Sequence, residues 1–380
     1  MKILHLSESG LPDWRIEKAA LTGYEDGKNE VFFCGYGTRN YKRDFQVFSR
    51  IYEIKWTDKA MRGFPFYQDM VKKQIKKIIN EIKPDIIHAH NIFAAKVISD
   101  FDIPFVFDNH EFWKIFSKVR LEKDIRSSNN IKYQRNPIRK ILRNMLLNYS
   151  ANLWVKWEAD IIRKHPTITV SDTIADELKK IGNTNNVFVV PNFPMQFEIK
   201  DIQIPEKQKE ISLIYAGADK IGGKNPTFRD FGGLAEVIDK KDVCKMTFIG
   251  VQGPDTNNIR YTGFIPRTNM FNEMTKHSIG LIPWKKHWAH KYLNPNKYAE
   301  YAHTGLFVMC TSSLETISTT LKDHCITFED YEDLVTKIEY FKNNIEEMYN
   351  KRIKIYKFAR ENLLWERYHK NILDAYRICT

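Results

Sequence analysis

The sequence predicts an α/β protein built from two doubly wound parallel sheets, and three observations support this prediction. Short apolar runs alternate with amphipathic segments, which is the pattern of parallel strands joined by helices. The alternation occurs in two series, separated by a polar stretch with two prolines at residues 194–210 that we interpret as a linker. A chain of 380 residues is also long enough for two domains, each with its own core.

Each series consists of recognisable candidate strands. Those of the first are KILHLS (2–7), EVFFCG (30–35), DIIHAH (85–90), PFVFDN (104–109), PTITVS (166–171) and VFVVPN (187–192). Residues 66–82 form a helix, because their apolar side chains recur on one stripe. The second series is SLIYAG (212–217), CKMTFIG (244–250), SIGLIPW (278–284), LFVMCTS (306–312) and CITFED (325–330), and the last fifty residues are helical in pattern. We expect domains at 1–195 and 196–355, followed by a closing helical segment at 356–380.

Bulk composition points to a folded, soluble protein. Hydrophobic residues make up 43% of the chain and aromatic residues 13%, which excludes a disordered protein. No apolar stretch is long enough for a membrane-spanning helix, and the amino-terminal apolar run is too short for a signal peptide. The five cysteines are far apart and form no C-x-x-C pair, which favours reduced thiols and a cytoplasmic protein.

The net charge of +12 is concentrated in one segment. Residues 112–165 contain thirteen Lys and Arg against four Asp and Glu. A local basic surface indicates a phosphate-bearing or membrane-surface partner. It does not describe a protein coated for nucleic acid, which we regard as an unlikely partner.

Within this basic segment, residues 137–164 form an amphipathic helix in pattern. Its apolar positions are Ile138, Ile141, Leu142, Met145, Leu146, Tyr149 and Leu153, with Trp154 and Trp157 just beyond. Arg139, Lys140 and Arg143 flank the stripe, and this combination suits a helix at the interface of an anionic membrane. The alternative is an ordinary helix that buries the same stripe against its own sheet.

The ordered set of motifs resembles a known family. MKILHLSESG, KPDIIHAHN, IPFVFDNHE, SDTIADELKKIG and VFVVPNFP in the first half, and LIYAGADKIGGK, TFIG, IRYTGFIP and NPNKYAEYAHTGLFVMCTSS in the second, resemble the retaining family-4 glycosyltransferases of the GT-B fold. The resemblance implies two Rossmann-like domains facing across a cleft. It also implies that the last helix, in WERYHKNILDAY, crosses back onto the first domain.

The resemblance gives Glu300 a role at the nucleotide. A carboxylate accepts hydrogen bonds from both hydroxyls of a ribose, and Glu300 matches the second glutamate of the family's E-x7-E motif. Tyr292 stands where the family has the first glutamate. The alternative is a helix glutamate paired with a lysine such as Lys297.

The diphosphate of the donor needs backbone N–H groups and cations. Leu293–Lys297, which includes Asn294 and Asn296, should open the helix that carries Glu300, with Pro295 in the first turn. By resemblance Lys224 matches the family's phosphate lysine and acts in catalysis near Gly217. Ala218 replaces the family arginine, and Lys220 or Arg267 are the candidate substitutes.

In the first domain, HEFWK lacks the second histidine of a zinc-protease motif. His110 instead matches the family histidine near the reacting sugar, and we assign it a catalytic role. His88 and His90 are interpreted as pointing to opposite faces of their strand, with His90 on the acceptor side together with Gly10 and Asn109. The sequence shows no metal cluster, and the resemblance implies neither a metal nor a cofactor.

These inferences predict a hexosyltransferase that moves a sugar from a nucleotide-diphosphate sugar to a glycan or lipid-linked acceptor, with retention. By resemblance, attack occurs on the front face of the sugar with the leaving diphosphate as base. Two alternatives stay open: a GT-B nucleotide-sugar epimerase, and a non-catalytic basic nucleic-acid-binding protein. The predicted place of action is the cytoplasm, at the inner face of the membrane for a lipid-linked acceptor.

Overall fold

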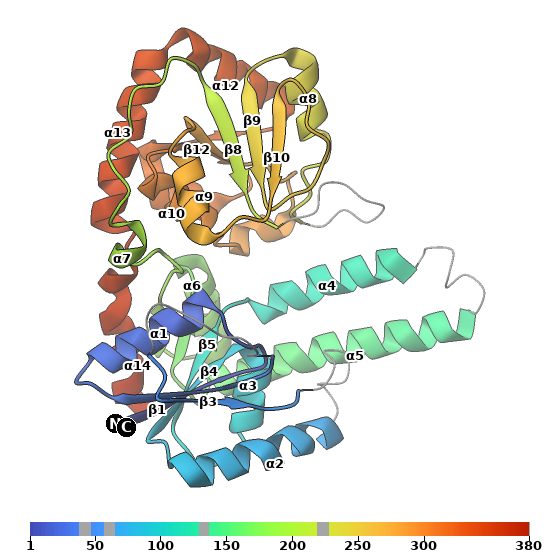
Figure 1. Ribbon diagram of the computed structural model, residues 1–380. Helices are drawn as coiled ribbons and strands as arrows, with labels where there is room; N and C mark the ends of the chain where they lie inside the picture. The colour runs from blue at the N-terminus through green and yellow to red at the C-terminus, as the bar shows by residue number, and fades with distance from the viewer. Residues whose placement is uncertain (38–46, 57–64, 129–136, 219–227, 380) are drawn as a thin grey trace. The chain divides into compact units, whose positions relative to one another are not determined.

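The computed structural model describes residues 1–37, 47–56, 65–128, 137–218 and 228–379 (Figure 1). The chain forms two compact units, one made of Met1–Asn192 with Tyr368–Thr380 and the other of Phe193–Arg367. These divisions fall after residues 192 and 367, whereas the sequence analysis placed domain limits after 195 and 355. We call the two parts unit 1 and unit 2.

Unit 1 is built on a seven-stranded parallel sheet in the order β3-β2-β1-β4-β5-β6-β7. The strands are β1 (Lys2–Ser7), β2 (Glu30–Gly35), β3 (Arg50–Glu53), β4 (Ile86–His90), β5 (Phe105–Asn109), β6 (Thr167–Thr169) and β7 (Val187–Val189). Only β3 was missing from the predicted set. It is an edge strand of four partly exposed residues, RIYE, and therefore lacks the apolar run that marks the others.

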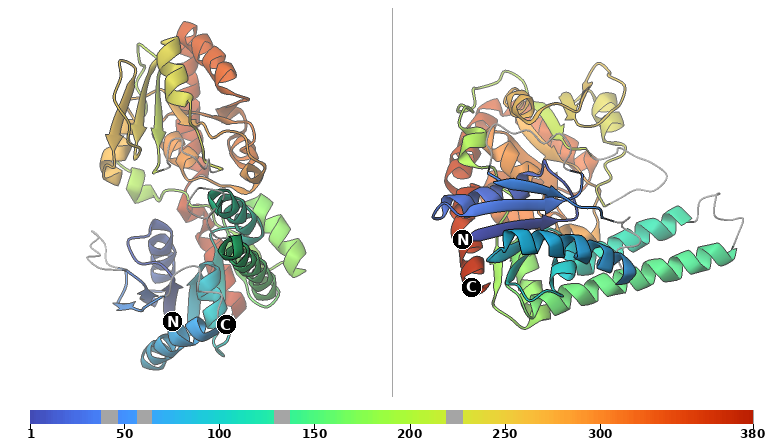
Figure 2. Two further views of the ribbon diagram at one scale, coloured as in Figure 1. Left: turned by 90° about the vertical axis from the view of Figure 1, so that its right-hand side faces the viewer. Right: turned by 60° about the horizontal axis from the view of Figure 1, so that its bottom comes forward.

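Helices cover both faces of this sheet. On one face lie α1 (Trp14–Glu25) and α14 (His369–Cys379), and on the other α2 (Pro65–Ile82), α3 (Asn91–Ile98) and α5 (Pro137–Ile162) (Figures 1 and 2). α6 (Asp172–Gly182) joins β6 to β7. α4 (Trp113–Ser128) runs side by side with α5, and both extend well beyond the edge of the sheet (Figure 1).

Unit 2 has a six-stranded parallel sheet in the order β10-β9-β8-β11-β12-β13. Its strands are β8 (Ser212–Ala216), β9 (Lys245–Ile249), β10 (Ile259–Gly263), β11 (Ile279–Ile282), β12 (Phe307–Thr311) and β13 (Cys325–Phe328). Its helices are α7 (Gln196–Ile199), α8 (Leu234–Lys241), α9 (Arg267–Met274), α10 (Lys297–His303), α11 (Glu315–Leu321), α12 (Tyr331–Asn343) and α13 (Ile345–Asn362), with short 3-10 turns η2 (Trp288–Tyr292), η3 (Lys322–His324) and η4 (Trp365–Tyr368). β10 was not predicted, because IRYTG has only one buried residue.

Two expectations about the ends of unit 2 need correction. Residues 194–210 are more than a linker: they belong to unit 2, contain α7, and bury Ile199 and Ile202 completely or nearly so. The helical segment expected at 356–380 is two helices, since α13 ends at Asn362 and α14 begins at His369. The residues of α14 belong to unit 1, where the helix packs on α1, β5, β6 and β7.

The strand order reverses at one point in each sheet, between β1 and β4 in unit 1 and between β8 and β11 in unit 2. Loops diverge on either side of such a point, and ligands of doubly wound sheets bind there, beyond the carboxyl ends of the strands. Both sheets are therefore confirmed as Rossmann-like. Among the described residues, no helix combines the length and apolarity that crossing a bilayer requires.

Candidate functional site

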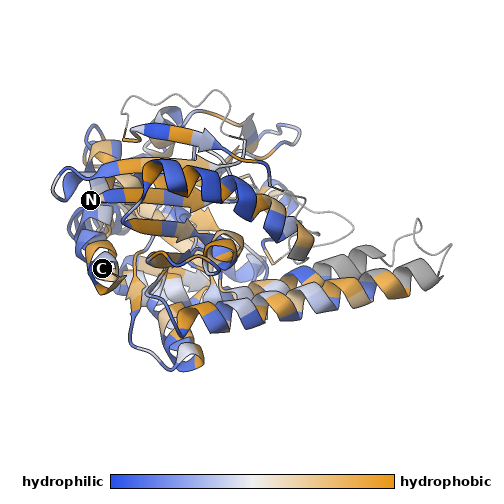
Figure 3. Ribbon diagram, turned by 90° about the horizontal axis from the view of Figure 1, so that it is seen from below, coloured by the Kyte–Doolittle hydropathy of each residue, from blue (hydrophilic) through white to orange (hydrophobic). Residues whose placement is uncertain are grey.

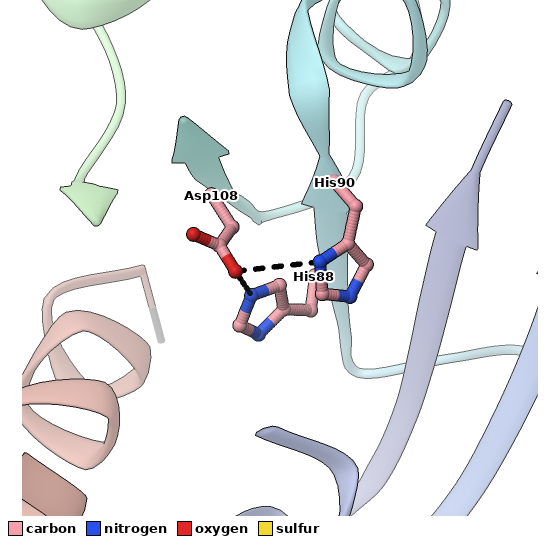
Figure 4. A group of neighbouring side chains, drawn as sticks. All are labelled: His88, His90 and Asp108. Atoms are coloured by element: carbon pink, nitrogen blue, oxygen red, sulfur yellow. Dashed lines mark hydrogen bonds and ion pairs between the residues drawn. The ribbon is translucent and has the colours of Figure 1, made fainter. Parts of the chain in front are cut away.

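A buried cluster of charged and imidazole side chains lies at the carboxyl end of the unit 1 sheet. At its centre is Asp108 of β5, which has 1% of its side chain exposed. Arg15 of α1 donates from Nη2 to Oδ1 at 2.6 Å and from Nε to both carboxylate oxygens at 3.1–3.2 Å. On the other side, His88 Nε2 and His90 Nδ1 of β4 approach Oδ2 at 3.2 and 3.3 Å (Figure 4).

The prediction that His88 and His90 point to opposite faces of β4 was wrong. Side chains alternate along a strand, so residues two positions apart share a face. The two rings are stacked with centroids 4.5 Å apart. His5 on β1, which lies opposite His88 in the strand register, adds a third ring 4.8 Å from that of His88.

The hydrogen bonds define one arrangement of protons with neutral imidazoles, which leaves His5 Nε2 as a buried acceptor without a partner among the described residues. The hydroxyl of Tyr376 on α14 donates to His88 Nδ1 at 2.8 Å, so His88 Nε2 carries the proton directed at Asp108. His5 Nδ1 then donates to His90 Nε2 at 3.0 Å, and His90 Nδ1–H faces Asp108. One carboxylate, one guanidinium and neutral histidines leave the cluster without net charge.

The electrostatics agree with this assignment. Burial lowers the pKa of His5, His88 and His90, for His5 and His90 well below the usual value. Burial alone would raise the pKa of Asp108, but Arg15 and the surrounding imidazoles hold it well below its usual value. The carboxylate is therefore ionised and the buried histidines are neutral at pH 7.

His110 is the member of the cluster that reaches the surface, with 16% of its side chain exposed. Its Nε2 lies 3.2 Å from His90 Nδ1 and 3.3 Å from Asp108 Oδ2. Asn91, at a left-handed φ of 65° directly after β4, places its Nδ2 3.5 Å from His110 Nδ1. Asn91 Oδ1 is buried without a hydrogen-bond partner among the described residues. His110 and Asn91 are thus the polar groups that this cluster presents outward.

Two residues predicted on the acceptor side, Asn109 and Gly10, make contacts that support the fold of unit 1. Asn109 is fully buried and donates from Nδ2 to Oε1 of Glu158 on α5 at 2.8 Å. Glu158 also accepts from the backbone N–H groups of Trp113 and Lys114 at the start of α4, and burial raises its pKa to about 7. Gly10 lies against the backbone of the loop after β2, where a Cβ would come within 2.4 Å of Tyr36 O.

Sequence reasoning missed Arg15, Asp108 and Asn91 as parts of this site. A signal for two of them was present in the sequence. Asp108 lies at the end of the strand in IPFVFDNHE, and Asn91 directly follows the strand in KPDIIHAHN. Asparagine is also a residue that readily adopts the left-handed φ found at position 91. His90, assigned to the acceptor side, is fully buried behind His110.

The nitrogen and oxygen atoms of His88, His90 and Asp108 lie within 4.8 Å of one another, close enough to share a metal ion. However, the carboxylate already accepts from Arg15, and both imidazoles direct N–H groups at it in the arrangement above. A cation in this place would also stand next to the guanidinium of Arg15. We therefore interpret the group as a hydrogen-bonded support for His110.

In unit 2 the predicted nucleotide carboxylate, Glu300, lies in the first turn of α10 with 8% exposure. Arg267, the first residue of α9, donates from Nη1 to Glu300 Oε1 at 2.7 Å and from Nε to Glu198 Oε2 at 2.8 Å. Burial opposes the charge of Arg267, but the two carboxylates raise its pKa. Glu300 Oε2 has no bond to a described residue.

Lys297 does not pair with Glu300, contrary to the alternative raised from sequence. Its ammonium lies 5.2 Å from the ring centres of both Tyr215 on β8 and Trp284 after β11. A Cβ on Gly217 would come within 2.6 Å of Lys297 Nζ, so the missing side chain makes room for this lysine at the end of β8. A cation is thereby held at the point where the strand order reverses.

The loop before α10 differs from its prediction in one detail. Asn296 is the N-cap residue and Lys297 the first helical residue, so Pro295 precedes the helix and is not in its first turn. Asn294 is half-buried and Asn296 is exposed. Lys220 and Lys224 lie outside the described residues.

Comparisons with known proteins agree with this architecture. Residues 28–193 match the model of Glycosyltransferase Family 4. No curated protein matches the chain in sequence. The matched segment covers most of unit 1, and the prediction of a GT-B fold protein that resembles family-4 glycosyltransferases is confirmed.

Solved structures extend the likeness to the whole chain. Sucrose-phosphate synthase from Thermosynechococcus elongatus has a TM-score of 0.70 at 10% identity, with 99% of this chain and 98% of that chain covered. HepE from Anabaena, solved with UDP and with UDP-glucose, has a TM-score of 0.65 at 11% identity, with 99% and 100% covered. A Listeria monocytogenes protein assigned as a UDP-N-acetylglucosamine 2-epimerase has a TM-score of 0.55 at 12% identity, with 99% and 95% covered. At these identities the likeness establishes the fold, which transferases and an epimerase share.

The buried histidines predict that the free energy of unfolding falls as the pH is lowered from about 7 to about 5. Their folded-state pKa values lie below the value of about 6.5 in an unfolded chain, so the unfolded state binds more protons in this window. Each excess proton costs about 1.4 kcal/mol per pH unit. The depressed pKa of Asp108 adds its own loss only below about pH 4.

Urea denaturation of wild type and His5→Gln across this window measures the effect. Gln keeps a hydrogen-bond donor but does not titrate. The free energy of unfolding of the variant should therefore change less steeply with pH, by up to about 1.4 kcal/mol per pH unit. An identical slope in the two proteins would contradict the assignment of His5 as a neutral buried imidazole.

Proposed function

We propose that the protein is a retaining glycosyltransferase, which moves a hexose from a nucleotide-diphosphate sugar to a glycan or lipid-linked acceptor. The observation that carries the proposal is the arrangement of Glu300, Arg267 and Lys297 at the carboxyl end of the unit 2 sheet. The family match in unit 1 and the GT-B fold support the same conclusion. The nucleotide complexes of HepE support a nucleotide sugar as donor.

Glu300 is the proposed ligand of the ribose. Arg267 holds one carboxylate oxygen, Oε1, and so orients the other oxygen. A carboxylate fixed in this way accepts hydrogen bonds from vicinal hydroxyls without first losing side-chain freedom. Arg267 itself is bound to two carboxylates, which makes it a positioning residue more than a phosphate ligand.

Cations near the end of β8 are the proposed partners of the diphosphate. Lys297 is held beside Gly217 by two aromatic rings, and by resemblance Lys224 contributes a second positive charge, with Lys220 as its alternative. Asn294 and Asn296 lie in the loop that leads to Lys297. Positive charge here stabilises the leaving nucleotide as its bond to the sugar breaks.

On the unit 1 side, His110 and Asn91 are proposed to contact sugar hydroxyls. The imidazole of His110 is oriented by His90 and Asp108, and Asn91 Oδ1 is a buried acceptor that a hydroxyl would satisfy. In the proposed transfer, the acceptor oxygen bonds to the anomeric carbon as the carbon–phosphate oxygen bond breaks. The acceptor proton passes to the leaving phosphate oxygen, so the chain contributes positioning and charge stabilisation.

We place this reaction in the cytoplasm, with a lipid-linked acceptor at the inner face of the membrane.

A thermal-shift panel of nucleoside diphosphates and their sugars tests the donor, because a ligand that binds only the folded state raises its melting temperature. At least one nucleotide should raise the melting temperature by several degrees when present at about a hundred times its Kd. No shift with any member would contradict the proposal.

The two alternatives make different predictions. An epimerase converts a free nucleotide sugar without an acceptor, whereas a transferase forms product only when an acceptor is added. A nucleic-acid binder would show affinity that falls steeply with salt and ignores nucleotide sugars.

Replacing Glu300 by Gln should weaken binding of the nucleotide sugar by about 1.5–3 kcal/mol, because a charge-assisted hydrogen bond is lost. Isothermal titration calorimetry measures this change, and the fold should persist because the substitution is isosteric. Glu198→Gln is the matched control, since Glu198 binds the same arginine at nearly the same distance. Equal losses in both variants would show that Glu300 acts only through Arg267.

Lys224→Ala should lower kcat on the order of a hundredfold, because a cation at the departing diphosphate acts mainly in the transition state. Lys220→Ala should have a smaller effect. Arg267→Ala should raise KM for the donor more than it lowers kcat, since Arg267 positions Glu300. Steady-state kinetics on the three variants measure these effects. Near-normal turnover of Lys224→Ala, together with an inactive Arg267→Ala, would contradict the assignment of Lys224 as the cation at the diphosphate.

A further inference from the structure

The outer half of α5 carries an exposed apolar face. The exposed fractions are 58% for Ile141, 60% for Leu142, 64% for Met145, 37% for Leu146 and 57% for Tyr149. Their spacing places them on one side of the helix, and Figure 3 shows hydrophobic ribbon along this part of α5. We call these five residues the α5 apolar face. Exposed apolar clusters of this kind mark interaction surfaces.

The inner half of the same helix behaves differently. Trp154 and Trp157 are buried, and the ring of Trp154 packs edge-on against Phe93 and Trp113. The two interpretations of this helix therefore apply to different halves of it. Its inner turns pack into unit 1, as in an ordinary helix, whereas the face at 141–149 is exposed in the part of the chain that the structure describes.

A groove between α4 and α5 adjoins the apolar face. It encloses about 30 Å³ and shares Leu146 with that face; its other lining residues are Ser117, Arg120, Leu121, Leu147, Ser150, Ala151 and Trp154. Ser117 Oγ and Trp154 Nε1 are buried without a hydrogen-bond partner among the described residues, although both residues are at least 97% buried. A space of this size admits a water molecule but not a lipid chain, so the groove is not itself a lipid site.

Charge identifies the kind of surface that would cover this face. The segment 112–165 has thirteen basic and four acidic residues, so an anionic partner is electrostatically complementary. Lys114 and Lys118 on α4 are half-buried and exposed. An apolar stripe flanked by cations is the pattern of helices that lie in the interface of an anionic bilayer, where each cation strengthens binding.

We propose that α4 and α5 together dock on an anionic lipid bilayer. The α5 apolar face lies among the headgroups and upper acyl chains, and the basic side chains of the segment meet the anionic headgroups. The role of this docking, which is to give access to a lipid-linked acceptor, rests on the proposed function. The binding itself requires neither donor nor acceptor.

Vesicle flotation of the full chain, without nucleotide sugar, tests the docking. Vesicles of phosphatidylcholine with 30% phosphatidylglycerol should bind the protein, whereas phosphatidylcholine alone should bind it at least about tenfold more weakly at low salt. Raising the salt to about 0.5 M should remove most of the difference, because the Debye length shortens to a few ångströms.

Variants on the exposed face separate docking from folding. Leu142→Ser with Met145→Ser should lower binding at least about tenfold, because both side chains leave water on docking. The matched control is Phe66→Ser on α2, which is 68% exposed in the same unit and should bind like wild type. Reversing Arg139, Lys140 and Arg143 to Glu should abolish the preference for phosphatidylglycerol.

Fluorescence quenching by brominated lipids tests which part of the protein meets the bilayer, because Trp154 lies on α5 one to four turns from the α5 apolar face. Trp154→Phe should remove a large part of the quenching, whereas Trp288→Phe, an exposed tryptophan of unit 2, should leave it unchanged. Binding that is unaffected by Leu142→Ser with Met145→Ser, or quenching that does not depend on Trp154, would overturn the proposal. So would self-association through this face in the absence of lipid.

The results separate this inference from the proposed function. Transfer to a soluble acceptor without vesicle binding would refute the docking alone. Vesicle binding by a protein that binds no nucleotide sugar would refute the proposed activity alone.

Discussion

The buried ion pair between Asp108 and Arg15 is the interaction on which unit 1 depends most. Removing two charges from water is costly, and the cost is offset only when geometry is good and every remaining polar atom is paired. Here the guanidinium binds both carboxylate oxygens and also the backbone carbonyl of Val190, and the imidazoles bind the side it leaves open. The pair thereby connects α1, β4, β5 and the segment after β7, and breaking it would cost about 3–5 kcal/mol.

This requirement explains why His110, the group proposed to contact sugar, lies at the edge of the cluster. His5, His88 and His90 are fully buried, and the hydroxyl of Tyr376 closes the cluster from α14. Of the four imidazoles in the cluster, that of His110 alone has appreciable exposure, with its ring held by its buried neighbours. A histidine supported in this way keeps one orientation without spending binding energy on ordering it.

Unit 2 solves a similar problem with one arginine between two carboxylates. Arg267 connects Glu198, near the start of the unit, with Glu300 in α10, and so orients the carboxylate proposed to bind ribose. The cation at the sheet is instead Lys297, which two aromatic rings hold beside Gly217. In both units a carboxylate at the carboxyl end of the sheet, Asp108 or Glu300, is oriented by an arginine from a distant part of the chain.

The sequence alone determined the two-sheet α/β class and every strand except the edge strands β3 and β10, because local periodicity and composition mark buried strands and these two lack an apolar run. It also offered Glu300 and His110 as candidate site residues through motifs that are short and contiguous. Only the tertiary structure decided what orients them: Arg267 is 33 residues from Glu300, and Asp108, which lies beside His110, is paired with Arg15 from 93 residues away. The exposure of the α5 apolar face was equally undetermined, since a helical stripe has the same pattern whether or not another element covers it. Local patterns specify elements, whereas pairing and burial depend on where the folded chain brings those elements together.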